Sequence, residues 1–353
     1  MKHVIFGESH GSAIGVVLEQ VPAGLELNIE EIAREMARRA PGKNPLSTAR
    51  KEADVPHILS GFFQGKTTGA PLCAIIENTD QHSRDYEKNR YLARPGHADY
   101  AGYVRYRGCN DYRGGGHFSG RLTAPLVFAG AVAKQILALK GISIGAHIRQ
   151  ISNVGDTPFT NDETPLTAEL LHEIGTKAFP VLDDDRGTEM QMEILAAKEA
   201  QDSVGGIIEC GVLGLPAGIG APDFGCNVEG IFAQHMFAIP AVKGIAFGAG
   251  FGFVGMKGSQ ANDPIYMEGS QVKTRTNFNG GVNGGISNGM PVLFDVAIRP
   301  TPSIAQEQDT IDLAAQANAK LRIEGRHDPC IVHRAVPVIE AAAALATCEL
   351  LGI

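Results

Sequence analysis

Polar and apolar positions follow one another along the chain in patterns that predict both helices and strands. Near the N-terminus, Asn28 followed three residues later by Glu31 is typical of a helix N-cap and its acidic partner. The helix predicted from there runs over about 29–39, and Pro41 and Gly42 end it. Both ends of this helix are therefore marked in the sequence.

The longest apolar stretch covers residues 122–139 and contains Lys134 and Gln135. It predicts a long buried helix that starts after Thr123 rather than a membrane span. The predicted elements lack the regular strand–helix–strand order of a parallel sheet, so we expect an α/β or α+β class. Further helices are predicted over about 188–201, 311–322 and 337–350, and strands over 72–77, 206–212 and 292–298.

The composition is that of an ordinary folded protein, except for its glycine content. Apolar residues make up 44% and charged residues 20% of the 353 residues, which excludes a disordered chain and allows one large domain or two ordinary ones. Glycine accounts for 43 residues, well above the usual level of about 7%. These glycines are clustered, which predicts tight turns, some of them around a ligand.

Charge and aromatic content exclude some classes of partner. The net charge of -8 argues against an overall electrostatic attraction to nucleic acid or to an anionic membrane. The lack of Trp argues against a stacking platform for single-stranded nucleic acid. Six scattered cysteines without a CxxC pair predict reduced thiols, and no long apolar stretch follows the basic start as in a secretory signal. We therefore expect a cytoplasmic protein.

Two polar clusters lie in the first 51 residues. Glycines bracket a Glu-Ser-His run at 7–11, where Ser9 and His10 are expected on a tight turn. Such a turn suits a proton donor beside a ligand, and it is equally typical of a strand end with an exposed histidine. Residues 34–51 contain six cations and one acid, which suits phosphate or carboxylate oxygens or a solvated loop.

The richest cluster surrounds three consecutive glycines at 114–116. Free backbone N–H groups before a predicted helix start suit an anion, with Ser119 and Arg121 expected at the mouth. The region lacks both the GK[ST] of a Walker loop and the GxGxxG of a dinucleotide fold. His97, His117 and several arginines lie nearby in the sequence, so we predict an anionic ligand site.

Two further clusters lie in the C-terminal half. A cation and two hydroxyls at 299–303 suit a terminal phosphate or a turn at a strand end. His-Asp-Pro-Cys at 327–330 has residue types that bind metals, but no second cluster completes a tetrahedral set, so we expect no metal site. Asp328 is better interpreted as a positioned base or an orienting carboxylate.

These clusters, in this order, resemble the chorismate synthase family. The resemblance is carried by the motifs GESHG, SGFFQGKTTGAP, ENTDQHSRDY, RPGHADY, DYRGGG, GGISNG and RHDPC, and it runs from about residue 4 to the final helix. It implies one domain over 1–353 with an α+β fold, a three-layer β-α-β sandwich. In this fold, helices lie between two antiparallel sheets with internal pseudo-symmetry. It also implies a homotetramer.

The resemblance implies a carbon–oxygen lyase that converts 5-enolpyruvylshikimate 3-phosphate to chorismate and phosphate by anti-1,4-elimination. It implies reduced FMN as cofactor, although the overall reaction is redox-neutral, and NAD(P)H as an indirect reductant. The substrate carries two carboxylates and a phosphate, so arginines are required, and the departing phosphate needs charge stabilisation. The electron-rich flavin assists removal of the C6 proton.

Motif matching also implies roles for individual residues. His10 matches a position near the departing phosphate, His97 one beside the flavin ring, and Asp328 one near flavin N5, while Ser9 and Ser119 support this network. The positions that match substrate-binding arginines are Arg39, Arg94 and Arg121, and Arg39 also matches a nicotinamide position. The positions that match flavin-binding residues are His117, Phe118, Ser119, Pro240, Ala241, Gly284, Arg299, Pro300, Thr301, Pro302, Ser303 and Arg326.

The chain departs from the family pattern in two places. The family commonly has Arg-Ser-Ser-Ala-Arg-Glu-Thr where this chain has His-Phe-Ser-Gly-Arg-Leu-Thr at 117–123, and Ala40 and Pro45 stand where arginine is frequent. We expect nearby cations to supply the missing charge. Two alternative functions stay open: an NAD(P)H-dependent flavin oxidoreductase and a non-catalytic protein that binds flavin or anions.

Overall fold

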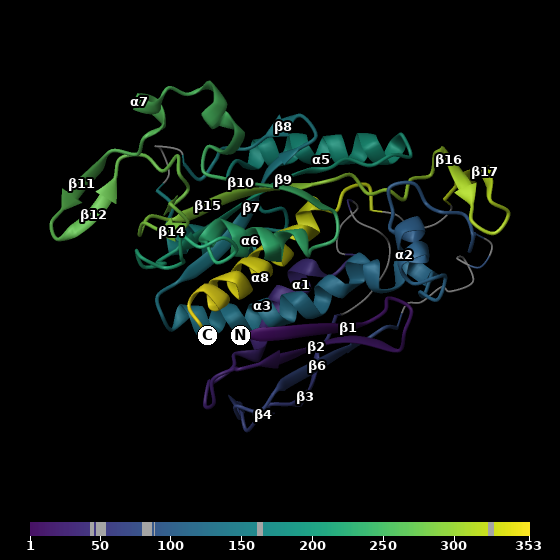
Figure 1. Cartoon of the computed structure of the whole chain (residues 1–353), viewed down its shortest axis with the longest axis horizontal. Helices are drawn as coiled ribbons and strands as arrows, with labels where there is room; N and C mark the ends of the chain where they lie inside the picture. The colour runs from purple at the N-terminus through teal and green to yellow at the C-terminus, as the bar shows by residue number, and fades with distance from the viewer. Residues whose placement is uncertain (43–45, 47–53, 80–86, 88, 161–164, 324–327) are drawn as a thin grey trace.

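The protein, seen here as a computed structural model, consists of helices enclosed between two antiparallel sheets (Figure 1). The structure describes residues 1–42, 46, 54–79, 87, 89–160, 165–323 and 328–353. The N-terminal sheet has, in spatial order, the strands β1 (Lys2–Gly7), β2 (Ala13–Glu19), β6 (Leu72–Glu77) and β3 (His57–Ser60). The C-terminal sheet has, in spatial order, the strands β10 (Val242–Phe247), β15 (Val292–Ile298), β9 (Gly206–Leu213), β7 (Ser143–Ile151) and β8 (Val154–Gly155).

The layer between the sheets is helical, as the family resemblance implies. It contains α1 (Ile29–Arg39), α3 (Thr123–Ala138), α6 (Val228–Phe237) and α8 (Val332–Leu350) (Figure 1). Two more helices pack against the C-terminal sheet: α4 (Ala168–Thr176) contacts β7, and α5 (Asp184–Glu199) contacts β7 and β8 on the outer face of the sheet (Figure 1). The predicted α+β sandwich is therefore confirmed, with an additional helical layer on one side.

The apolar stretch at 122–139 forms the centre of the molecule. From Thr123 to Ala133 every residue of α3 is buried, because the helix lies between the N-terminal sheet and α8. A methyl group on Gly130 would overlap Ala341 of α8, so the two helices cross at close range. Small residues at this crossing explain why α8 is rich in alanine.

Shorter elements complete the chain. They are the helices α2 (Asp99–Arg105) and α7 (Gly258–Ala261) and the 3₁₀ turns η2 (Arg113–Phe118), η3 (Gly120–Leu122) and η4 (Gly250–Gly255). The two-stranded hairpins are β4 (Phe62–Phe63) with β5 (Lys66–Thr67), β11 (Ile265–Glu268) with β12 (Gln271–Thr274), β13 (Val282–Asn283) with β14 (Ile286–Ser287), and β16 (Glu307–Asp312) with β17 (Ala317–Arg322). Within the described ranges, no helix combines the length and apolar character needed to span a bilayer.

The two halves of the molecule repeat one arrangement. The elements β1, β2, α1, β3, β6 and α3 recur as β7, β9, α6, β10, β15 and α8, with matching strand orders β1-β2-β6-β3 and β7-β9-β15-β10. The hairpins β4–β5 and β13–β14 also correspond. The hydroxyl of Thr67 donates to the Pro22 carbonyl at 2.5 Å, and that of Ser287 donates to the Pro216 carbonyl at 2.6 Å. The pseudo-symmetry implied by the resemblance is therefore present.

Most of the elements predicted from the sequence are confirmed, including α1 with its Asn28 cap at 3.1 Å from the Glu31 amide. The helices α5 and α8 begin earlier than predicted. The helix predicted over 311–322 is wrong, since this region forms the β16–β17 hairpin. The Asp312 carboxylate accepts hydrogen bonds from two following backbone amides at 2.8 and 2.9 Å. This turn outweighs the helix propensity of the alanines beside it.

Candidate active site

Most of the predicted site residues line one cavity of about 390 Å³. It lies where the connection from β6 to α3 meets the connection from β15 to α8. The predicted residues that line it are Arg39, Arg94, His97, Phe118, Ser119, Arg121, Pro240, Ala241, Arg299, Thr301, Pro302, Ser303 and Asp328. Loops more than 200 residues apart in the sequence therefore meet in one place.

The three glycines at 114–116 form a tight turn between two imidazole rings. All three have positive φ, between 54° and 90°. A methyl group on Gly114 would overlap the His10 ring, and one on Gly115 would lie 2.9 Å from Cε1 of His97. Only glycine allows the chain to pass this closely between the two rings. The turn therefore has His97, which lines the cavity, on one side and His10, which does not line it, on the other.

His10 lies behind this turn and is held by Ser9. Its side chain is buried, with 5% of the residue exposed, and Nδ1 lies 3.1 Å from the Ser9 hydroxyl. That hydroxyl also lies within 3.3 Å of the Arg113 carbonyl, to which it can donate. The Gly114 backbone lines the cavity directly in front of the imidazole. His10 is thus fixed in orientation beside the cavity.

His97 is held by a carboxylate that sequence reasoning did not single out. Nδ1 of His97 donates to Asp99 at 2.7 Å, and Arg94 makes two hydrogen bonds to the same carboxylate at 2.7 and 2.8 Å. Burial opposes ionisation of Asp99, but the hydrogen bonds from Arg94 and His97 hold its pKa well below the usual range. The spacing of the three residues in the RPGHADY motif is the signal that could have revealed this group.

Arg39 and Arg121 lie side by side because one buried carboxylate joins them. Asp54 is 2% exposed and forms ion pairs with both guanidinium groups. Arg39 also donates to the Thr123 hydroxyl at 3.2 Å, and Arg121 donates to Asn78 at 3.0 Å. Burial raises the pKa of Asp54, but the two arginines outweigh burial and lower it. Counted over the described residues, Arg39, Arg121 and Asp54 together carry one positive charge.

Asp328 is held by Arg334, to which the sequence analysis assigned no role. Nη1 of Arg334 donates to the Asp328 carboxylate at 2.8 Å. Nε of the same arginine donates to the backbone carbonyl of Arg39 at 3.1 Å. One guanidinium thus connects the start of α8, Asp328 and the end of α1.

The region around Arg299 has buried donors that the rest of the described chain leaves unsatisfied. Nε of Arg299 and the hydroxyl of Thr301 are buried without a hydrogen-bond partner among the described residues. Gly96 lies against Arg299, since a methyl group there would be 3.1 Å from Nη1. Ala241 adopts a positive φ of 75°, and its carbonyl accepts from the Arg299 amide at 3.0 Å. Buried donors without partners suit an anionic ligand group.

A further arginine at the cavity escaped sequence reasoning. The Arg90 guanidinium lies 5.1 Å from the ring centre of Tyr91 and 4.9 Å from that of Tyr112, and all three residues line the cavity. Two aromatic faces orient the cation without neutralising it. None of the motifs that carry the family resemblance includes it.

Some predicted residues lie elsewhere. His117 is exposed, and its Nδ1 donates to the Gly7 carbonyl at 2.8 Å. Pro300 does not line the cavity. Gly284 belongs to the turn between β13 and β14, at the left of Figure 1, whereas α2 lies at the right. Arg326 lies outside the described residues, as do Lys43, Pro45, Arg50 and Lys51 of the basic loop.

Comparisons with known proteins identify the family of the chain. The sequence model of the family described as Chorismate synthase matches residues 1–351. A chorismate synthase from Thermococcus kodakarensis is 45% identical over 341 residues, which cover 96% of this chain and 92% of that protein. One from Methanocella arvoryzae is 45% identical over 340 residues, covering 96% and 89%. A solved structure described as "Crystal Structure of Chorismate Synthase" is 29% identical with a TM-score of 0.77, covering 99% of this chain and 91% of that one. The chain belongs to the chorismate synthase family.

Proposed function

We propose that the cavity is the active site of a lyase that converts 5-enolpyruvylshikimate 3-phosphate to chorismate and phosphate. The observation that carries this proposal is the meeting of His97, Asp328 and several arginines around one cavity, with His10 held behind its glycine turn. Family membership supplies the reaction, and the site chemistry suits it.

The charge of the cavity fits a substrate with two carboxylates and a phosphate. Six arginines are found among its described lining residues, and three carboxylates contact them. The site therefore retains excess positive charge for a ligand with several anionic groups. The arginines are Arg39, Arg90, Arg94, Arg121, Arg299 and Arg334, and the carboxylates are Asp54, Asp99 and Asp328.

The residues present also fit FMN. The unsatisfied buried donors of Arg299 and Thr301 would hold its phosphate, and Pro240 and Ala241 provide an apolar edge in the same cavity. Reduced FMN, when bound, supplies the electron density that assists loss of the phosphate and of the C6 proton. The protein binds and orients the substrate around it and excludes water.

The histidines and Asp328 would handle charge and protons. His10, fixed by Ser9, would stabilise or protonate the departing phosphate. His97 is oriented by Asp99, so its ring is held at one nitrogen while the other lies against the glycine turn. Asp328, fixed by Arg334, would accept a hydrogen bond or proton near the reacting carbon.

The deciding experiment is an anaerobic assay with 5-enolpyruvylshikimate 3-phosphate and dithionite-reduced FMN. We expect chorismate absorbance and phosphate release to rise together in equal amounts. Steady consumption of NAD(P)H with no elimination would instead identify a flavin oxidoreductase. Binding of FMN and phosphate without turnover would identify a non-catalytic protein.

Three finer points belong to the same proposal. We propose that NAD(P)H acts only as an indirect reductant of the flavin and that the enzyme is cytoplasmic, because all six cysteines are unpaired in the structure. We also propose a homotetramer. The arm formed by η4, α7 and the hairpin β11–β12 projects from the body (Figure 1) and exposes Phe251, Val254 and Ile265. Exposed apolar side chains on such an arm suit contact with another copy, which light scattering on the purified protein would test.

A further inference from the structure

We infer that Arg334 is a positioning residue that sets the distance between Asp328 and the end of α1. This inference rests on the proposed function, because it concerns how two walls of that active site are held together. One wall carries Asp328, and the other carries Arg39 with its partner Arg121.

The first argument is the geometry of the guanidinium. Nη1 of Arg334 donates to Asp328 at 2.8 Å, and Nε donates to the Arg39 carbonyl at 3.1 Å. The side chains of Arg334 and Asp328 are only 15% and 14% exposed, so water competes little for these bonds. A planar guanidinium presents its donors in a fixed fork, and both contacts therefore determine one position of Asp328.

The second argument is the place at which Arg334 meets α1. Arg39 is the last residue of α1, and the carbonyls of a final helical turn have no partner within the helix. A cation at this end also interacts favourably with the helix dipole. Arg334 thus acts as a cap from a different helix, and movement of the α1 end would be transmitted to Asp328.

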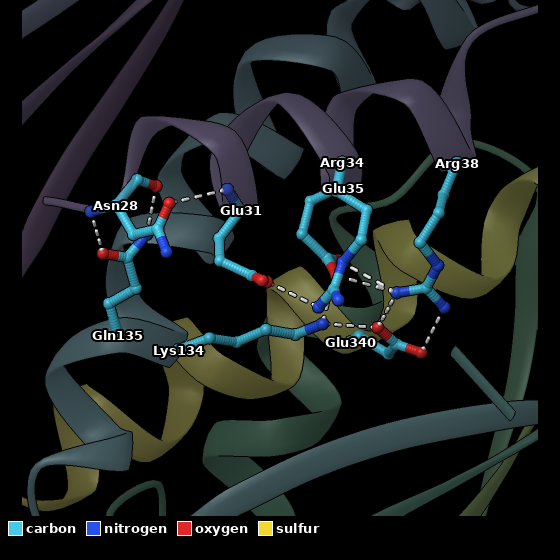
Figure 2. Close-up of polar contacts among 8 residues, drawn as sticks. All are labelled: Asn28, Glu31, Arg34, Glu35, Arg38, Lys134, Gln135 and Glu340. Carbon is cyan, nitrogen blue, oxygen red and sulfur yellow. Dashed lines mark hydrogen bonds and ion pairs between the residues drawn. The ribbon is translucent and has the colours of Figure 1, made fainter. Parts of the chain in front are cut away.

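A second connection between the same two helices lies behind the cavity. Figure 2 shows Arg38 making two hydrogen bonds to the Glu340 carboxylate, at 2.6 and 2.7 Å, with Lys134 and Glu35 in the same cluster. Burial opposes ionisation of Glu340, but Arg38 and Lys134 lower its pKa to about 2. Arg38 therefore fixes α1 against α8 from the back.

The two connections have different consequences. The Arg38 cluster joins α1 to α8 but touches no residue that we place in the chemistry. Arg334 touches both Asp328 and the α1 end, so among the described residues it links the contact between the helices to the reacting centre. Substitution of Arg334 should therefore leave the protein folded but shift the Asp328 side chain from its position.

The experiment compares Arg334→Gln and Arg334→Lys with the wild-type enzyme in the anaerobic assay. We expect Arg334→Gln to lower kcat by about 10- to 100-fold, the usual effect of releasing a group that orients an active-site residue. FMN affinity, measured by flavin fluorescence, should change by less than about threefold. Lysine keeps the charge but has one nitrogen, so Arg334→Lys should recover only part of the loss. Full recovery by lysine, or wild-type kcat in Arg334→Gln, would overturn the inference.

A double-mutant cycle with Asp328→Asn separates positioning from general loss of stability. If Arg334 acts through Asp328, adding Arg334→Gln to Asp328→Asn should lower kcat by less than about twofold. A further loss as large as in the wild-type background would show an independent structural effect. The control is Arg186→Gln, which breaks an exposed ion pair with Glu189 on α5 and should leave kcat unchanged.

Hydrogen exchange on the protein without ligands gives a readout that does not need turnover. Arg334→Gln should speed amide exchange in the last turn of α1 relative to the wild type, while Arg186→Gln should not. Unchanged exchange there would contradict the capping role. Suppose that amides in the last turn of α1 exchange slowly in the wild type and faster in Arg334→Gln, but the wild type performs no elimination. This result would disprove the proposed function and still support the contact between Arg334 and α1.

Discussion

The two halves of the molecule share a scaffold but differ in what their connections do. In each half, one long connection leads from the third strand of the shared sheet order into the last helix. In the N-terminal half this is 78–122, from β6 to α3, and in the C-terminal half it is 299–331, from β15 to α8. Both connections reach the same cavity. The repeat therefore determines where the site lies.

The chemistry of the two connections is different. The first supplies His97, the glycine turn and Arg94, and the second supplies Arg299, Thr301 and Asp328. The halves also differ outside the site, since residues 156–205 add α4 and α5 to the C-terminal half, where the N-terminal half has only the short turn at 8–12. A duplicated scaffold with unlike connections can thus surround one ligand with complementary groups.

The largest effect is expected where the second connection meets the reacting centre. Asp328→Ala should lower kcat by about 10²–10⁴-fold, because a positioned base is lost, while FMN affinity changes little. Anaerobic turnover and flavin fluorescence measure the two quantities. Near-normal turnover would show that the C-terminal connection only binds ligands.

The first connection should be most sensitive at its glycine turn. Gly114→Ala places a methyl group against the His10 ring at a φ of 57°, so the turn must shift, and we expect a loss in kcat of about 100-fold. The matched control is Gly141→Ala, where φ is also positive, at 74°, but a methyl group has nothing within 4 Å. Equal activity of both variants would mean that the two imidazoles need not flank the turn.

The sequence predicted which residues line the site better than it predicted which of them contact one another. Arg39, His97 and Asp328 stood out because cations, imidazoles and carboxylates beside glycine turns are chemically informative. Asp54 did not, because an acid after a basic loop gives no sign that it will be buried between two arginines. Asp54 lies 15 residues from Arg39 and 67 residues from Arg121 in the sequence, and only tertiary packing brings the three together.

The fold was predicted in part for similar reasons. Local sequence patterns predicted α1 and α3 correctly. The alanines near 314–319 predicted a helix, but Asp312 accepts a hydrogen bond from a following amide and stabilises the turn of the β16–β17 hairpin instead. The internal repeat was visible as glycines at 61, 65 and 69 and again at 281, 285 and 289, all with φ near 80°. The sequence hides this repeat because the spacing between equivalent strands varies, from 141 residues between the starts of β1 and β7 (2 and 143) to 220 between those of β6 and β15 (72 and 292), and the intervening loops differ.

Acid should weaken the C-terminal half through His333. Burial, with a smaller effect from Arg334, lowers the pKa of this histidine to about 4. The centre of its ring lies 6.2 Å from that of Phe179, a residue of the loop between α4 and α5. Between pH 6.5 and 4 the unfolded chain binds a proton at this histidine that the folded chain does not bind. The free energy of unfolding therefore decreases as the pH decreases through this range. We expect roughly 2 kcal/mol less stability at pH 5 than at pH 7 from this group.

Urea unfolding at the two pH values measures this loss. His333→Leu keeps an apolar side chain at the site and should remove about this part of the pH dependence. The same pH dependence in wild type and variant would assign the acid sensitivity to other groups.

The smallest effect tests the equivalence of the halves directly. Thr67→Val and Ser287→Ala each delete a buried hydroxyl that donates to a proline carbonyl and accepts from a backbone amide at 3.0 Å. Each should lower the free energy of unfolding by about 1–2 kcal/mol without changing kcat, since neither residue lines the cavity. Because the sites lie in separate halves, the double variant should show the sum within about 0.5 kcal/mol. If the two single variants lose unequal amounts of unfolding free energy, the hydroxyl contact is not equivalent in the two halves. A change in kcat would show that this contact also affects the active site.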